Sequence, residues 1–241
     1  MEYTPVYETG NGGSIPSSGA ITSIKYSMEY KIKSVFGPKI YKSRLDNDAI
    51  DLLKTVAEQS KKDKSFFGHM LAGNIEQQFA AQFNIDQQNQ FLQIIYEHVH
   101  TCAVEFDKNL NRIFGKTGVT DITYNLGPGP WLNVQRAGEF NPAHQHTGNL
   151  SVVIYIDIPP VIAEENQHTD SEIKSPVAGI ISFIHGDDSY WYNSIDHHIP
   201  KTGDILIFPA SLKHSVYPFK SPVERVSMAF NVYDITVDNG P

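Results

Sequence analysis

Two histidines, His144 and His146, stand two residues apart just before a strongly apolar stretch at 150–158. Residues i and i+2 of an extended chain point to the same face, so both imidazoles can reach one metal ion at about 2.1 Å. Taken alone, the pair also fits two ordinary loop or surface histidines. The spacing therefore marks a candidate metal site that needs further ligands.

A third histidine and an arginine follow in the last part of the chain. His214 comes after an apolar stretch at 204–208 that ends at Pro209, and Arg225 opens an alternating stretch at 225–236. Each has an ordinary interpretation, His214 as a polar loop residue and Arg225 as the solvated start of a strand. The combination indicates chemistry, because a His-x-His pair is followed about 70 residues later by one histidine and eleven residues after that by an arginine.

The elements that must position these side chains fall into two blocks. Apolar residues at helical spacing predict a helix that begins at Asn47 or Asp48 and ends near residue 60, and a longer helix over 86–114. After Gly118 the pattern changes to a period of two. Strands are predicted over the residues 121–126, 131–135, 150–158, 179–185, 204–208, 215–217 and 225–236.

Helices followed by strands, without alternation, predict an α+β fold. A helical part (46–115) would pack against a β core (120–236) built as a sandwich or barrel of antiparallel sheets. We expect a single domain over 26–241 and a flexible N-terminal arm over 1–25, which is rich in Gly, Ser, Pro and Thr. Within the domain, a bent strand is predicted over 26–41 and a long polar loop over 161–178.

Composition and charge exclude several classes of protein. A chain of 241 residues with 40% hydrophobic and 19% charged residues can bury a sizeable core, and a net charge of −8 argues against nucleic acid as a partner. The single cysteine, Cys102, excludes an intrachain disulfide and a Cys-rich zinc site. No signal peptide and no run of ~18 apolar residues is readable, so we expect no membrane span and a cytoplasmic location. The sequence is compatible with an oligomer.

The motifs and their order resemble the Fe(II)/2-oxoglutarate-dependent dioxygenases. The resemblance is strongest to their prolyl-hydroxylase-like branch and to a small family of 2-oxoglutarate (2OG)-Fe(II) oxygenases found in bacteria and phages. It covers roughly residues 30–235. It rests on the phrases Phe36-Gly37-Pro38-Lys39-Ile40-Tyr41, Trp131-Leu132-Asn133-Val134, His144-Gln145-His146, Leu150-Ser151-Val152-Val153-Ile154-Tyr155-Ile156, Gly203-Asp204-Ile205-Leu206-Ile207-Phe208-Pro209, His214-Ser215-Val216-Tyr217-Pro218 and Arg225-Val226-Ser227-Met228-Ala229-Phe230-Asn231.

This resemblance implies a double-stranded β-helix (a cupin-like jelly roll) with the N-terminal helices packed on one sheet. It implies Fe(II) bound by His144 and His214, and 2-oxoglutarate as cosubstrate with its C5 carboxylate paired to Arg225. Asn133 and Tyr155 would face the barrel interior, where they would either hydrogen-bond the cosubstrate or only line the barrel. The implied reaction uses O₂ to hydroxylate an unidentified small molecule or protein side chain, with release of succinate and CO₂.

The chain departs from the family pattern at one metal ligand. The family has a carboxylate two residues after the first histidine, and here that residue is His146. Neutral imidazole also binds ferrous iron, so we expect three histidines to form the site, although zinc or nickel would fit them too. Two rival functions follow: a non-catalytic jelly-roll module that binds metal or is structural, and a three-histidine cupin-type oxygenase that does not use 2-oxoglutarate. Arg225 argues against both, because neither needs a clamp for a dicarboxylate.

Overall fold

The computed structural model describes residues 37–63, 65, 73–107, 122–167, 177–191 and 193–237. The predicted arm over 1–25 lies outside the described residues, as does most of the predicted bent strand. The helices are α1 (Asn47–Asp63), α2 (Ile85–Asp107) and α3 (Pro160–Glu165). The strands are β1 (Tyr41–Arg44), β2 (Gln77–Ala80), β3 (Ile122–Asn125), β4 (Trp131–Gln135), β5 (Asn141–His144), β6 (Leu150–Asp157), β7 (Ile181–Ile184), β8 (Ile195–His198), β9 (Asp204–Pro209), β10 (Lys213–Val216) and β11 (Arg225–Val237).

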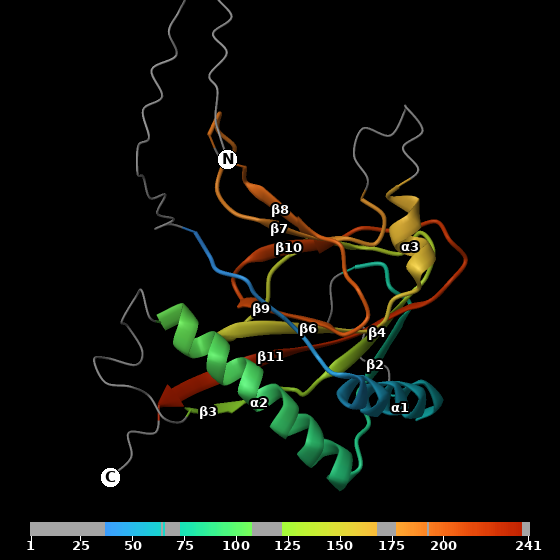
Figure 1. The fold of residues 1–241 in the computed structure, drawn as a ribbon, viewed down its shortest axis with the longest axis vertical. Coiled ribbons are helices and arrows are strands. Elements are labelled where there is room, and N and C mark those ends of the chain that lie inside the picture. Colours follow the sequence, from blue (N-terminus) through green and yellow to red (C-terminus); the bar gives the residue numbers. More distant parts are fainter. Residues whose placement is uncertain are drawn as a thin grey trace, which may run out of the picture. The chain divides into compact units, whose positions relative to one another are not determined.

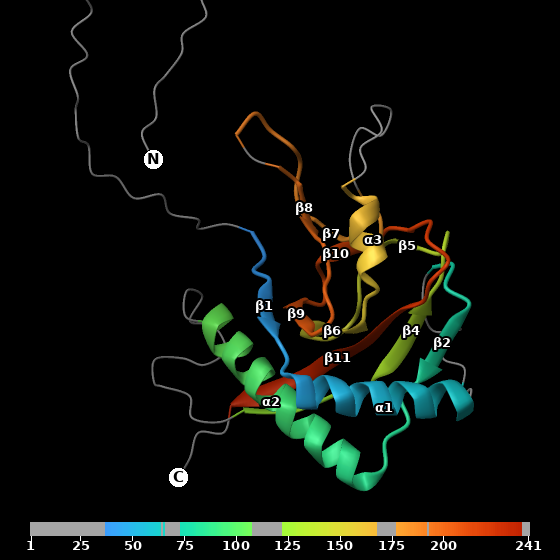
Figure 2. The same ribbon diagram turned by 45° about the vertical axis from the view of Figure 1, so that its right-hand side comes forward.

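Two antiparallel sheets face each other (Figures 1 and 2). The larger sheet has the strand order β1-β9-β6-β11-β4-β2, with β3 paired to β11, and the smaller has the order β5-β10-β7-β8. From β4 onward the chain passes back and forth between the sheets, with β4, β6, β9 and β11 in the larger one and β5, β7, β8 and β10 in the smaller one. Eight strands wound in this way form a jelly roll, so the predicted fold class is confirmed.

The larger sheet is covered by α1 and α2 on the face that points away from the smaller sheet (Figure 2). Buried residues of both helices, such as Leu53 and Ile95, belong to one apolar cluster with every second residue of the central strands. The strand residues of this cluster include Leu132, Val134, Val152, Ile154, Ile156, Ile205, Ile207, Val226, Met228, Phe230 and Val232. Because side chains alternate along a strand, the residues between them point into the space between the two sheets.

Both long helices begin with a side-chain cap. Asp46 caps α1 through its Oδ1, which accepts a hydrogen bond from the Ala49 N–H at 2.8 Å, so the cap lies one or two residues before the predicted one. Asn84 and Gln87 cap α2 reciprocally, each side-chain oxygen accepting from the other residue's backbone N–H at 2.9 Å. Both predicted helices are therefore confirmed over their described residues, and the predicted end of the second one lies outside them.

One prediction about the connections is wrong. The stretch predicted as a loop over 161–178 begins with α3, which starts at Pro160 in the first turn, where proline is favoured, and buries Ile162. Of the bent strand predicted over 26–41, only residues 37–41 are described, and β1 begins at the last of them, Tyr41, so this expectation stays a prediction. In addition, the strands β2, β5 and β8 were not predicted from the sequence.

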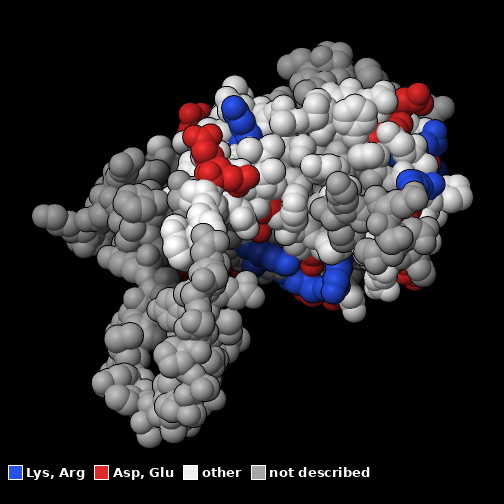
Figure 3. Space-filling model, turned by 90° about the horizontal axis from the view of Figure 1, so that it is seen from above, with Lys and Arg blue, Asp and Glu red and all other residues white. Residues whose placement is uncertain are grey.

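The described helices include none long and apolar enough to cross a membrane. On the face drawn in Figure 3, Lys and Arg side chains occur in small groups near Asp and Glu side chains. The expectations of a cytoplasmic location and of no nucleic-acid partner stay predictions.

Candidate active site

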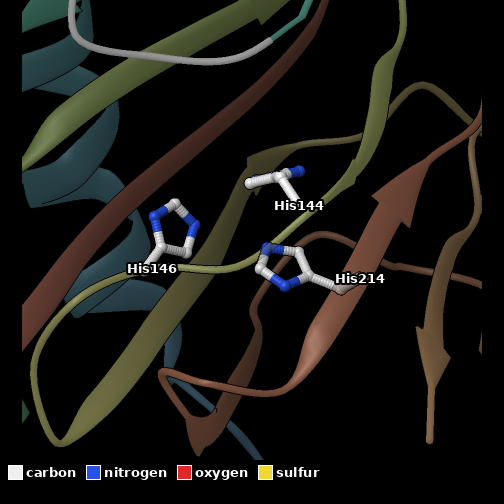
Figure 4. A group of neighbouring side chains, drawn as sticks. All are labelled: His144, His146 and His214. Atoms are coloured by element: carbon white, nitrogen blue, oxygen red, sulfur yellow. The ribbon is translucent and has the colours of Figure 1, made fainter.

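Three histidines meet between the two sheets (Figure 4). His144 ends β5, His214 lies on β10, and the two residues are register partners across that strand pair. His146 follows β5, where its backbone N–H donates to the Ala210 carbonyl at 2.9 Å. The ring centroids are 4.3 to 5.1 Å apart, and one ligand nitrogen from each histidine lies within 4.8 Å of the others. Among the described residues, this is the one group of three or more His, Cys, Asp or Glu side chains placed to hold a metal ion.

The hydrogen bonds of two of these rings fix which nitrogen is free. Nδ1 of His144 lies 2.7 Å from the Pro142 carbonyl, and Nδ1 of His214 lies 3.0 Å from the Leu212 carbonyl. A carbonyl can only accept, so in both rings Nδ1 carries the proton and Nε2 presents a lone pair. Backbone partners of this kind orient metal-binding histidines.

The surroundings favour the uncharged form of His146 and His214. Burial lowers the pKa of His146 to about 4 and that of His214 to about 3, and in both cases the neighbouring His144 lowers it further. Aromatic side chains contribute to this burial, since Phe208 lies 4.9 Å from the His214 ring and Trp131 lies 5.9 Å from the His146 ring, between centroids. Neutral imidazoles need lose no proton to bind a cation.

Arg225 lies in the same pocket and is almost completely buried, with 3% of its surface exposed. Its Nη1 donates to Oε1 of Gln135, and its guanidinium carbon lies 5.1 Å from the centre of the Tyr155 ring. In the described part of the chain, no carboxylate forms an ion pair with it and its Nε has no hydrogen-bond partner. Burial lowers the pKa of Arg225, yet a guanidinium stays charged at neutral pH. The pocket therefore contains an uncompensated positive charge.

Tyr155 is also fully buried, and its hydroxyl has no hydrogen-bond partner among the described residues. Burial raises the pKa of Tyr155 to about 12, and Asp204 raises it too, while Arg225 acts in the opposite direction. The hydroxyl is therefore protonated at neutral pH and can donate. A buried donor beside a buried cation is the arrangement expected of a site for a carboxylate.

These groups line one pocket of about 230 Å³ between the sheets. Asn133 lies in its wall, as predicted, and its Oδ1 accepts a hydrogen bond from Nε2 of Gln78 at 2.8 Å. The structure thus brings together all six residues singled out from the sequence, namely Asn133, His144, His146, Tyr155, His214 and Arg225. The pocket therefore combines three histidine side chains that could hold a metal ion with one buried cation.

The polar pocket residues that the sequence reasoning missed include Gln78 and Gln135. Gln78 lies on β2, which was not predicted as a strand. Gln135 could have been found, because on the predicted strand 131–135 it shares the inward face with Asn133.

A comparison with family models finds a match over the β core. Residues 129–231 match the family model described as "Putative 2OG-Fe(II) oxygenase". The match covers most of the β core and less than half of the chain, and it confirms the resemblance to the 2-oxoglutarate-dependent oxygenases noted from the sequence. Among curated proteins, none matches this sequence.

Several solved structures are similar in shape at low sequence identity. A prolyl-4-hydroxylase from Pseudomonas putida has a TM-score of 0.48 and 14% identity, covering 81% of this chain and 92% of that one. A Trichoplax adhaerens prolyl hydroxylase, solved with a peptide of the hypoxia inducible factor oxygen degradation domain, has a TM-score of 0.48, 13% identity and coverages of 82% and 84%. HygX from Streptomyces hygroscopicus, solved with nickel, 2-oxoglutarate and hygromycin B, has a TM-score of 0.44, 9% identity and coverages of 82% and 82%. At these scores the substrates of those proteins say nothing about the substrate of this one.

Proposed function

We propose that the protein is an Fe(II)- and 2-oxoglutarate-dependent dioxygenase that hydroxylates a small molecule or a protein side chain. The observation that carries this proposal is the placement of a buried Arg225, which has no carboxylate partner among the described residues, in the same pocket as three histidines that could hold a metal ion. A metal site alone would not need the arginine, and an anion site alone would not need the histidines.

The histidines would hold the metal. His144 and His214 offer Nε2, because their Nδ1 atoms are bound to backbone carbonyls, and His146 takes the position that a carboxylate fills in the family. Three protein ligands would leave further coordination positions of the metal for 2-oxoglutarate and O₂. Bound iron would supply the redox chemistry, in which O₂ decarboxylates 2-oxoglutarate to succinate and CO₂ and one oxygen atom hydroxylates a C–H bond of the substrate.

Arg225 and Tyr155 would hold the far end of the cosubstrate. The guanidinium pairs with the C5 carboxylate, and the Tyr155 hydroxyl donates to it, which gives both orphaned groups a partner. Asn133, whose Oδ1 is already occupied by Gln78, retains its Nδ2 as a further donor. Phe208 and Trp131 exclude water from the space beside the histidines, which strengthens these polar contacts.

A three-histidine metal protein that does not use 2-oxoglutarate is the second candidate. His146 favours this second candidate, because it replaces the carboxylate that the family pattern has at this position. The metal site then has one more unit of positive charge than the sites of the 2-oxoglutarate-dependent family. Arg225 argues against this second candidate, because a buried cation is costly unless a ligand supplies the negative charge that pairs with it.

The test is succinate formation from 2-oxoglutarate by protein reconstituted with Fe(II) in air. Wild type is expected to form succinate, while His214→Ala is expected to form none. His185→Ala serves as the matched control, because His185 is exposed and outside the histidine group. Binding of metal and of 2-oxoglutarate without any succinate would favour a non-catalytic module.

A further inference from the structure

Gln135 is held in one orientation by three hydrogen bonds. It is 1% exposed, and its Nε2 donates to the backbone carbonyls of Glu139 at 2.6 Å and Tyr217 at 3.2 Å. Its Oε1 accepts from Nη1 of Arg225. The reversed orientation would place the amide oxygen against two carbonyl oxygens and the NH₂ group against a guanidinium. The amide therefore has one orientation that satisfies it, with the oxygen toward Arg225.

The carbonyls that orient this amide are themselves fixed. The Glu139 carboxylate accepts hydrogen bonds from the backbone N–H groups of Arg136 at 2.7 Å and Glu76 at 3.2 Å, which ties the β4–β5 turn to the segment before β2. Gln135 and Arg225 are register partners on β4 and β11. The oxygen that meets the guanidinium thus belongs to a rigid part of the fold.

We propose that Gln135 is a positioning residue for the cosubstrate, because it holds Arg225 in place with an uncharged acceptor and leaves the full positive charge for the incoming carboxylate. This inference rests on the proposed function, in which that carboxylate is C5 of 2-oxoglutarate. Gln135 engages only Nη1 of the guanidinium, while Nε has no partner among the described residues. Gln135 touches the arginine and not the reacting atoms, so it acts through Arg225.

The neutrality of Gln135 is what matters for affinity. A carboxylate at this position would satisfy the guanidinium inside the protein, and the cosubstrate would then have to compete with it or bring a second negative charge beside the first. A side chain with no acceptor would leave Arg225 unfixed, so that the guanidinium would have to be ordered when the ligand binds. An amide avoids both costs.

The test compares the binding of 2-oxoglutarate and 2-oxopentanoate to Mn(II)-loaded protein by isothermal titration calorimetry. 2-Oxopentanoate has the same 2-oxo acid end and chain length but lacks the second carboxylate, so the ratio of the two dissociation constants isolates the C5 contact. In wild type, 2-oxoglutarate is expected to bind about 30-fold more tightly or better. Gln135→Met is expected to lower this preference about 10-fold, and Gln135→Glu to remove it. Gln88→Met, the same change at an exposed position of α2, should keep the wild-type ratio.

The outcomes separate this inference from the proposed function. A merely structural glutamine would lower Tm in the variants without changing the ratio, so an unchanged ratio in Gln135→Met overturns the inference whatever its Tm. If Gln135→Met does not fold, Gln135→Leu, which is also uncharged and has no acceptor, takes its place, and an unchanged ratio there overturns the inference. If wild type itself shows no preference for 2-oxoglutarate, the proposed function fails and the inference falls with it.

Discussion

Replacing Arg225 with Met is expected to make the ligand-free protein more stable while it removes most of the affinity for 2-oxoglutarate. The arginine is 3% exposed and, among the described residues, meets an uncharged Gln135 and the Tyr155 ring but no carboxylate. Taking a cation out of water costs several kcal/mol, and a cation–π contact returns about 1–2 kcal/mol. Met fills a similar elongated space without a charge.

Met also leaves the buried Oε1 of Gln135 without a donor, so the net gain in the free energy of unfolding of the metal-free protein should be at most about 2 kcal/mol, which raises Tm by up to roughly 6 °C. The loss of a desolvated, charge-assisted contact should weaken 2-oxoglutarate binding by about 2–4 kcal/mol, or ~30- to ~1000-fold. At a 2-oxoglutarate concentration of 100 times the wild-type Kd, wild type is stabilised by about 2.7 kcal/mol, whereas a variant with 100-fold weaker binding gains only about 0.4 kcal/mol.

The assay is urea unfolding, first of metal-free protein without ligand and then of Mn(II)-loaded protein with and without 2-oxoglutarate. Arg44→Met is the matched control, because the Arg44 side chain is 61% exposed on β1 and lies away from the pocket. It should change stability little and leave the shift caused by 2-oxoglutarate unchanged. If Arg225→Met is instead clearly less stable than wild type without ligand, the charge is compensated in the free protein. A full shift by 2-oxoglutarate in that variant would remove Arg225 from the site.

Three further predictions concern the metal and the buried polar groups. His146→Asp should retain metal in a Mn(II) titration, whereas His146→Ala should bind it more weakly; wild-type behaviour of both variants would mean that His146 is not a ligand. Burial holds the pKa of His214 at about 3, against 6.5 in the unfolded chain, so between these pH values the unfolded state binds more protons than the folded state. The metal-free protein should therefore lose stability as pH falls below 6.5. The loss from this residue should be on the order of 3 kcal/mol at pH 4. His214→Asn should flatten this dependence in urea unfolding at pH 7 and pH 4, and an equal dependence in the variant would contradict the assignment. Tyr155→Phe should leave the stability of the ligand-free protein within about 1 kcal/mol of wild type, because its hydroxyl has no partner among the described residues, yet weaken 2-oxoglutarate binding about 5- to 10-fold by calorimetry.

The central strands are predicted well from the sequence, because strands that are buried on both faces carry a long run of apolar residues. β4, β6, β9 and β11 each pair with strands on both sides and carry long apolar or alternating runs. The strands that the pattern did not reveal, β2, β5 and β8, lie at the edges of their sheets. An edge strand pairs on one side only and tolerates polar residues and proline, as in Asn141–His144.

The metal group was predictable from spacing, but its supporting contacts were not. His144 and His146 are two residues apart, and His214 follows a recognisable strand, so residue types alone drew attention to them. The contact between Gln135 and Arg225 depends on the register between β4 and β11, which joins residues 90 positions apart. Such a pairing is set by the whole sheet and leaves no local pattern.

The central claim is that one pocket binds a metal ion and the dicarboxylate together, and a crystal structure of the protein grown with Mn(II) and 2-oxoglutarate tests it most directly. The account predicts an anomalous peak for manganese at about 2 Å from one ring nitrogen of each of His144, His146 and His214. It also predicts the C5 carboxylate of 2-oxoglutarate at hydrogen-bond distance from Arg225 and Tyr155. Manganese bound elsewhere, or 2-oxoglutarate placed with neither carboxylate at Arg225, would contradict it.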